Sequence, residues 1–308
     1  MIEGIFEKLD TLYASGDPTA VEKFLVTTVK AFEANGEDGK PEYISVLNEL
    51  AGYYRGVSRY PESADVFLRA LALLEERDAA NTSGYAMVLL NLAGLYRLMG
   101  EREETVNLFL KAKAMLENAD PRDDYAYASV LNNLSLAYQE MGRLDEAYEM
   151  ELQSLEIARA GAGEAHEIAT ALNNLAAIRF RTRQLDEAEK LVAEALAIYD
   201  AMPEENVHHA AALATYASIR YSRKDFEEAL AAFQKSLALT DKFFGQNIEY
   251  ATASHNLSAT YEALGNIPEA MKHLAVALEL MERILGPDHA RTADCRVALL
   301  KMESRRGS

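Results

Sequence analysis

The sequence lacks the residues on which several classes of protein depend. It has one cysteine and no tryptophan, and no apolar stretch reaches the roughly 18 uncharged residues that span a bilayer. A single cysteine, Cys295, excludes an intramolecular disulfide and a cysteine-cluster metal site. The N-terminal segment carries acidic residues where a signal peptide needs a basic start and an apolar run, so we expect a cytoplasmic protein.

Positive charge is also scarce. The 308 residues include 31 Lys and Arg against 49 Asp and Glu, which gives a formal net charge of −18. Such a chain repels phosphate backbones, and no compact run of basic residues is present to drive counterion release. We therefore expect neither nucleic acid nor a membrane among its partners.

What the chain does contain is a sequence repeat. Segments 46–51, 89–93, 130–135, 171–176 and 254–258 share one order of apolar, amide and small residues. Extending the last large residue of each segment along the chain gives eight equivalent positions 41 or 42 residues apart, which we call anchors: Leu9, Leu50, Leu92, Leu134, Leu175, Tyr216, Leu257 and Leu299. Small residues recur one, thirteen and twenty positions after the anchor. A repeat of this length overrides the two domains that length alone suggests.

Each repeat predicts a pair of antiparallel helices. Apolar residues follow helical spacing around the anchor and again later in the unit. A turn inside the pair is marked by Gly100, Gly142 and Gly265, and breaker-rich links such as 118–121 and 285–288 separate the pairs. The pattern predicts an all-α chain of about seven helix pairs plus one closing helix.

The repeat resembles the tetratricopeptide repeat (TPR) family, and in particular its long-repeat version found in kinesin light chains. The segments that carry the resemblance are Asn173-Asn174-Leu175-Ala176, Leu185-Asp186-Glu187-Ala188-Glu189, Ala195-Leu196-Ala197-Ile198 and Leu285-Gly286-Pro287-Asp288-His289. The resemblance implies a right-handed superhelix, an α-solenoid whose first helices line the concave side. It specifies the fold better than the function, because such modules serve many unrelated systems.

We expect a single TPR solenoid over residues 1–303. It comprises a degenerate N-terminal pair at 2–35, six units over 42–285 and a capping helix at 289–303, followed by a disordered tail at 304–308. The two ends depart from the repeat and are polar, as the ends of a solenoid must be.

The sequence offers no assembled catalytic or metal site. His166, His208 and His209 have acidic neighbours, but adjacent residues on a helix point about 100° apart, so we interpret them as solvent-exposed linker histidines. Cys295 is interpreted as a passive thiol. Gly161 to Gly163 follow a helix and predict a turn between pairs rather than a phosphate loop. We expect no enzymatic activity, no metal and no cofactor.

The residue just before each anchor should point away from the core. These residues are Glu49, Asn91, Asn133, Asn174, Thr215 and Asn256, and a second row one position earlier holds Asn48, Asn132 and Asn173. Asparagine is unfavourable inside a helix, yet its amide can pair with the backbone of an extended peptide. In kinesin light chains and related TPR grooves the matching asparagines contact bound peptide, and the resemblance extends that role to Asn91, Asn133, Asn174 and Asn256.

The candidate partner-binding residues on the concave groove are Asn48, Asn91, Asn133, Asn174, Asn256, Arg55, Arg97 and Arg181. We expect Asn133 and Asn174, from consecutive units, to project side by side. Two alternatives stay open. The asparagines bridge neighbouring helices, or the arginines, which stand at the C-terminal ends of first helices, complement the helix dipole instead of attracting an acidic peptide.

The function that fits best is a non-catalytic scaffold or adaptor that binds an extended segment of a protein partner. One alternative is a regulatory receptor domain for a short signalling peptide or a small ligand. Another is a structural protein that self-assembles into a homo-oligomer through Met87, Leu98 and Leu136 or through its end helices.

Overall fold

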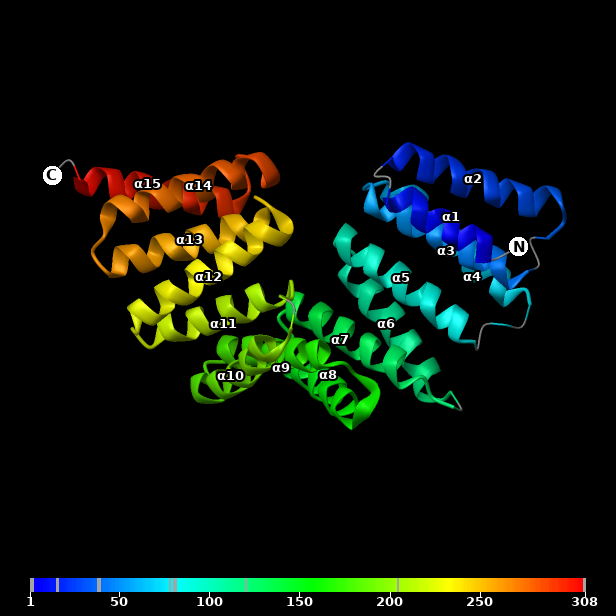
Figure 1. The fold of residues 1–308 in the computed structure, drawn as a ribbon, viewed down its shortest axis with the longest axis horizontal. Helices are drawn as coiled ribbons and strands as arrows, with labels where there is room; N and C mark the ends of the chain where they lie inside the picture. Colours follow the sequence, from blue (N-terminus) through cyan, green and yellow to red (C-terminus); the bar gives the residue numbers. More distant parts are fainter. Residues whose placement is uncertain are drawn as a thin grey trace. The chain divides into compact units, whose positions relative to one another are not determined.

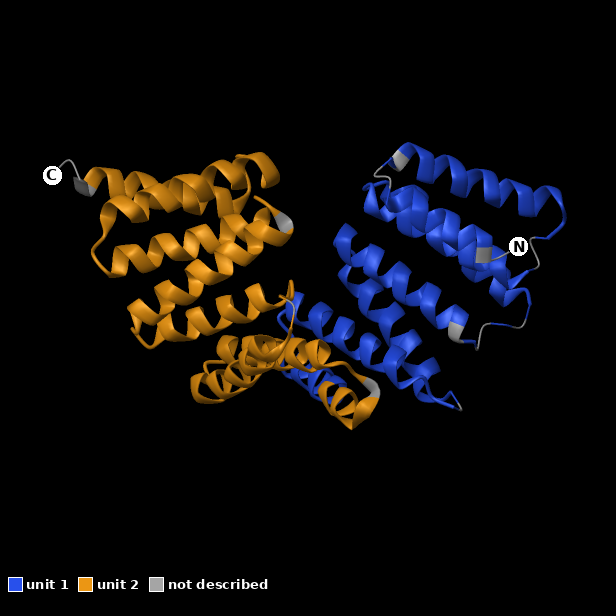
Figure 2. Cartoon of the chain, in the orientation of Figure 1, with its two compact units in different colours: residues 1–154 blue, residues 155–308 orange. Residues whose placement is uncertain are grey.

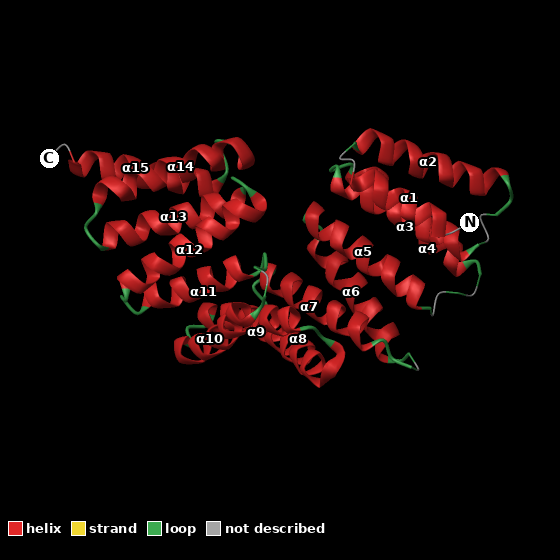
Figure 3. Ribbon diagram, viewed as in Figure 1, coloured by secondary structure: helices red, strands yellow, loops and turns green. Residues whose placement is uncertain are grey.

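The computed structural model describes residues 3–14, 17–37, 40–77, 79, 82–119, 121–203 and 205–306. Throughout these ranges the regular structure is helical, without any strand (Figure 3). The helices, in chain order (Figure 1), are α1 (Glu3–Ala14), α2 (Pro18–Ala34), α3 (Pro41–Gly56), α4 (Tyr60–Glu75), α5 (Ser83–Met99), α6 (Arg102–Glu117), α7 (Asp124–Glu140), α8 (Leu144–Ile157), the π-helical segment η1 (Ala158–Ala162), α9 (Ala165–Arg181), α10 (Leu185–Ala201), α11 (His209–Ser222), α12 (Phe226–Phe244), α13 (Ile248–Ala263), α14 (Ile267–Leu285) and α15 (Ala290–Arg306). The prediction of an all-α solenoid of seven pairs plus a closing helix is confirmed.

The chain divides into two compact units, residues 1–154 and residues 155–308 (Figure 2). Unit 1 contains α1 to α7 and most of α8, and unit 2 contains η1 and α9 to α15. In both units a first helix packs against the second helix of its own pair and against its neighbour along the chain. The single continuous solenoid over 1–303 stays a prediction.

Small residues at the expected positions bring the two helices of a pair together. The residues one position after the anchors in α3 to α13, from Ala51 to Ser258, are fully or almost fully buried. Ser63, thirteen positions after its anchor, donates from its Oγ to the carbonyl of Ala51 at 2.7 Å. A larger side chain at either place would push the helices apart, which explains why small residues recur at these positions.

The turns inside the six helix pairs from α3/α4 to α13/α14 use the same left-handed backbone, eight residues after the anchor. Gly100, Gly142 and Gly265 have φ values of +81°, +75° and +77° there, as the sequence predicts. The other three pairs place non-glycine residues in the same conformation: Ser58 (φ +61°), Arg183 (+66°) and Lys224 (+69°). Packing of the two helices therefore imposes the turn even where the residue type opposes it.

The described ends of the chain are formed by α1 and α2 and by α15. Asp17 caps α2, its Oδ1 accepting from the backbone N–H of Thr19 at 3.0 Å and of Ala20 at 3.2 Å. At the other end α15 continues to Arg306, into the segment where we predicted a disordered tail, and residues 307–308 lie outside the described residues. Among the helices described, none combines the length and the apolarity needed to cross a bilayer.

Candidate functional site

The residues before the anchors lie on first helices that touch their neighbours. Helix α5 contacts α3 and α7 in unit 1, and α11 contacts α9 in unit 2. Glu49, Asn91, Asn133, Asn174, Thr215 and Asn256 are all half-buried. Unit 1 therefore carries half-buried amide groups on the adjacent first helices α3, α5 and α7, whereas unit 2 carries them on α9 and α13, with Thr215 on α11 between them.

In unit 1 some of these polar groups bridge neighbouring first helices. Asn91 Nδ2 on α5 donates to Asn48 Oδ1 on α3 at 2.8 Å. Further along α5, the Arg97 guanidinium lies 3.2 Å from the carboxylate of Glu140 on α7. Asn48 and Asn91 thus form a bridge between neighbouring helices, as in the alternative stated for the asparagines, and Arg97 forms an ion pair with the next first helix.

The remaining predicted asparagines differ in their surroundings. Asn133 Nδ2 donates to the carbonyl of Ser129 on its own helix at 2.9 Å. Asn256, on α13, lines a pocket in unit 2. Asn133 belongs to unit 1 and Asn174 to unit 2, so the expectation that they project side by side stays a prediction.

The arginines at the ends of first helices are largely engaged with acidic residues. Arg220 contacts Glu189 at 2.6 Å and Glu228 at 3.1 Å, and Arg223 contacts Glu189 at 2.9 Å. Arg55 packs against α5, where a Cβ on Gly94 would lie 3.3 Å from its Nη1. Arg181 is exposed. These contacts favour a structural role for most of these arginines. Of the three predicted to bind a partner, Arg55, Arg97 and Arg181, the last is the most accessible.

A tyrosine–glutamate pair joins successive helix pairs in unit 1, a feature that the sequence reasoning missed. Tyr43 donates to Glu33 at 2.9 Å, Tyr127 donates to Glu117 at 3.2 Å, and Tyr85 donates to Glu75. Each tyrosine stands seven residues before an anchor and ten residues after its glutamate. Burial, and then the hydrogen bond to Glu33, raise the pKa of Tyr43 to about 12.

His209 corrects one of our sequence predictions. We expected a solvent-exposed linker histidine, but His209 begins α11 and is only 5% exposed. Its ring stacks on Tyr199 with a centroid distance of 5.3 Å, and burial lowers its pKa. His209 occupies the position seven before the anchor, where Tyr43, Tyr85 and Tyr127 stand in unit 1, and this equivalence is the signal that could have predicted burial.

His166 and Cys295 are two other candidates for metal binding or reactivity. His166 Nδ1 lies 3.3 Å from the carboxylate of Glu164, but no group of three or more potential metal ligands occurs among the residues with described positions. Cys295 is buried, its Sγ is 3.6 Å from the carbonyl of Leu274, and burial raises its thiol pKa to about 11. A thiol in this state is a poor nucleophile, which agrees with the passive role we expected.

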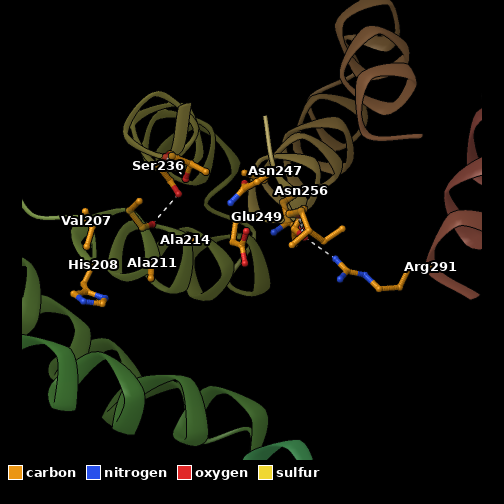
Figure 4. Close-up of a pocket in the computed structure, with 14 residues that line it drawn as sticks. Val207, His208, Ala211, Ala214, Ser236, Asn247, Glu249, Asn256 and Arg291 are labelled. Carbon is orange, nitrogen blue, oxygen red and sulfur yellow. Dashed lines mark hydrogen bonds between the residues drawn. The ribbon is translucent and has the colours of Figure 1, made fainter. Parts of the chain in front are cut away.

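The pocket in unit 2 is formed by α11, α12 and α13, with Arg291 reaching it from α15 (Figure 4). Its volume is about 600 Å³, and its lining is mostly apolar. Polar groups are few, among them Asn256, Thr252, Glu249 and Arg291. This combination of an apolar interior with a few polar groups is typical of ligand pockets of this size.

Antiparallel helix pairs repeated every 41 or 42 residues define an α-solenoid. A family model described as tetratricopeptide repeat matches residues 84–160, 167–242, 208–283 and 249–308, and the chain belongs to this family. TPR proteins generally mediate protein–protein interactions. No curated protein matches the chain in sequence.

Solved structures of low sequence identity share the fold. BtubC (BKLC) from P. vanneervenii is 23% identical, with a TM-score of 0.60 over 73% of this chain and 91% of that one. The Cut9–Hcn1 hetero-tetramer of the APC/C is 16% identical, with a TM-score of 0.67 over 96% of this chain and 48% of that one. A kinesin light chain with nearly identical TPR-like repeats from Podosopora anserina is 20% identical, with a TM-score of 0.51 over 65% of this chain and 95% of that one. The structural neighbours thus include kinesin-light-chain-like TPR proteins.

Proposed function

We propose that the protein is a non-catalytic scaffold that holds an extended segment of a protein partner along the exposed faces of its first helices. The observation that carries the proposal is the row of half-buried asparagines at one repeat position, because a solvent-facing row would be expected to carry Lys and Glu. An asparagine amide offers both a donor and an acceptor, which match the C=O and N–H of a peptide backbone.

Asn133 is the clearest representative of this row. Its Nδ2 donates to the carbonyl of Ser129 in its own helix at 2.9 Å. A bond within one helix does not itself join that helix to the next, which supports a binding role for Asn133 in the proposal. The proposed partner is a protein, as for TPR proteins in general, and the proposed setting is the cytoplasm, where the buried Cys295 stays a thiol.

The experiment uses a peptide selected on the full chain from a random-sequence phage library, with its affinity measured by fluorescence anisotropy. Replacing Asn133 and Asn174 by Ala should weaken binding roughly five- to hundredfold, because each lost hydrogen bond is worth about 0.5–1.5 kcal/mol. The melting temperature should stay the same or rise, since Ala is the better helix former.

The matched control is the double variant Asn48→Ala and Asn91→Ala, which removes the bridge between α3 and α5. This control should melt earlier. If the Asn133 and Asn174 variant instead melts earlier and binds the peptide with full affinity, these residues brace the fold and the proposal is wrong.

Self-assembly is a second candidate, favoured by exposed apolar residues. Met87 and Leu98 are 49% and 54% exposed in unit 1, and Val297 and Leu300 are 65% and 59% exposed on α15, whereas Leu136 is half-buried. Light scattering over a concentration series tests it. A mass that rises with concentration, and that Leu98→Lys or Leu300→Lys holds at the monomer value, would support assembly.

A further inference from the structure

The pocket in unit 2 is lined by alanines, one of which stands where other units carry larger side chains. Two residues before the anchor, the other units have Asn48, Leu90, Asn132, Asn173 and His255, whereas α11 has Ala214. Ala210, Ala211 and Ala253 line the same pocket, together with Val207 and Ile248. These small side chains widen the pocket, whose volume is about 600 Å³.

Polar atoms on the walls of this pocket already have partners. Ser236 Oγ donates to the carbonyl of Ala210 at 2.8 Å (dashed in Figure 4), and Thr240 Oγ1 donates to the carbonyl of Ser236 at 2.9 Å. Asn247 Oδ1 accepts from the backbone N–H of Tyr250 at 3.0 Å. With these donors and acceptors satisfied, the walls favour an apolar ligand body over water.

Arg291 supplies a positive charge beside this apolar space. Its Nη2 donates to Thr252 Oγ1 at 2.6 Å, and Thr252 in turn donates to the carbonyl of Ile248 at 2.8 Å, which fixes the guanidinium near α13 (Figure 4). Across the described part of the chain Arg291 forms no ion pair, in contrast to Arg220 and Arg223. The guanidinium therefore keeps most of its donors for a ligand.

The other charged and titratable groups of the pocket narrow the choice of ligand. Glu249 adds one negative charge to the lining, which disfavours a ligand with two or more negative charges. Burial lowers the pKa of His208, so its imidazole is neutral at pH 7 and adds no second positive charge. One guanidinium beside the Asn256 amide matches one carboxylate.

We propose that this pocket binds a small amphipathic monocarboxylate, with its apolar body among the alanines and its carboxylate on Arg291 beside Asn256. The site lies wholly within unit 2 and is distinct from backbone recognition by Asn133. It would make the C-terminal unit a receptor for a small apolar acid, whether or not a peptide binds elsewhere on the chain.

The experiment is isothermal titration calorimetry of the full chain with three probes that share one alkyl chain: octanoate, octanol and octylamine. Octanoate should bind about tenfold more tightly than either of the others, because charge-assisted hydrogen bonds to Arg291 are worth more than neutral ones. Arg291→Gln should lower octanoate affinity about tenfold and leave octanol binding unchanged.

A second variant tests the apolar part. Ala211 is an exposed residue of the lining, so Ala211→Leu fills the pocket without disturbing the core and should abolish binding of both octanoate and octanol. Matched controls outside the pocket are Arg283→Gln and Ala275→Leu, both on α14, which should bind octanoate as the unchanged chain does. The proposal is overturned if octanoate shows no saturable binding, if octylamine binds best, or if octanoate affinity survives Arg291→Gln or Ala211→Leu.

Discussion

The two units share one repeat but differ in chemistry. Unit 1 has 14 basic and 27 acidic residues, a formal charge of −13, whereas unit 2 has 17 and 22, a charge of −5. All six histidines lie in unit 2, and eleven of the sixteen tyrosines lie in unit 1. The helix pairs nevertheless form at the same spacing, so the repeat depends on the anchors and small residues and not on these polar groups.

The junctions between successive helix pairs show the same contrast at single positions. Unit 1 joins them with a tyrosine that donates to a glutamate, as in Tyr43 and Glu33. Unit 2 places His209 at the equivalent position and stacks it on Tyr199. Because the backbone tolerates either solution, the junction is where the two units can differ in their response to pH.

The largest expected effect comes from one core phenylalanine in each unit. Phe109 on α6 and Phe233 on α12 occupy equivalent positions and are 1% and 2% exposed. Replacing either by Ala should cost about 3–5 kcal/mol. Since each repeat contacts only its neighbours, Phe109→Ala should lower hydrogen-exchange protection in unit 1 and Phe233→Ala in unit 2. Equal loss throughout both units would show that the chain unfolds as one block.

Acid should weaken unit 2 before unit 1. Burial lowers the pKa of His208, His209, His255 and His273, all in unit 2. A histidine whose pKa is lower in the folded chain than its unfolded value of about 6.5 favours folding fully only above about pH 6.5. This contribution to the free energy of unfolding is lost as pH falls. Hydrogen exchange at pH 7 and pH 5 should therefore show lost protection in α11 to α14. His209→Phe should reduce the loss, and a larger loss in unit 1 would contradict this assignment.

Alkali should act on the Tyr43 junction of unit 1. The pKa of Tyr43 is raised to about 12, so its contribution is complete below about pH 10 and is lost as pH rises towards 12. The unfolding midpoint in urea, followed between pH 9 and pH 11 by circular dichroism, should fall less steeply in Tyr43→Phe than in the unchanged chain. Identical slopes would show that Tyr43 does not titrate in this window.

At neutral pH a smaller effect on stability is expected when Tyr43 loses its hydrogen bond to Glu33. Tyr43→Phe removes the hydrogen bond to Glu33 and should cost about 0.5–1.5 kcal/mol. Tyr250→Phe is the control in unit 2, because Tyr250 stands at the equivalent position and, among the described residues, its hydroxyl makes no hydrogen bond. Urea denaturation measures both, and an equal cost would mean that the glutamate contributes nothing.

The smallest effect concerns the left-handed turns. Arg183→Gly should stabilise unit 2 by about 0.5 kcal/mol, because relief of an αL penalty of about 1–2 kcal/mol exceeds the added entropy of the unfolded chain. Gly142→Ala, the reciprocal change in unit 1, should destabilise by about 1 kcal/mol. Thermal melts of both variants give the comparison, and destabilisation by Arg183→Gly would indicate that the Arg183 side chain has a role of its own.

Most of the fold follows from residues that recur at fixed spacing. The anchors, the small residues such as Ala51 and Ser63, and the turn glycines specify where helices begin, end and touch, because close packing allows few alternatives at these positions. The turns at Ser58, Arg183 and Lys224 could be located only by their register, since their residue types do not favour positive φ.

The candidate site was less predictable for a physical reason. Side-chain amides can bond along a helix, across helices or to a ligand, and the sequence alone does not distinguish these choices. The Asn48–Asn91 bridge and the burial of His209 became visible only when neighbouring helices were in place. The pocket also escaped prediction, because its lining combines residues from different repeats, such as Ala214 and Arg291.

The shared left-handed turn has a consequence for how repeats are added to or removed from such a gene. Gly100 and Gly142 occupy the same place in successive units and have nearly the same φ, so a crossover at their codons joins two chains without changing the local conformation. Such an event deletes or duplicates residues 101–142 as one whole module. The length of the chain can thus change by recombination in steps of one whole repeat, and each product keeps the left-handed turn between its paired helices.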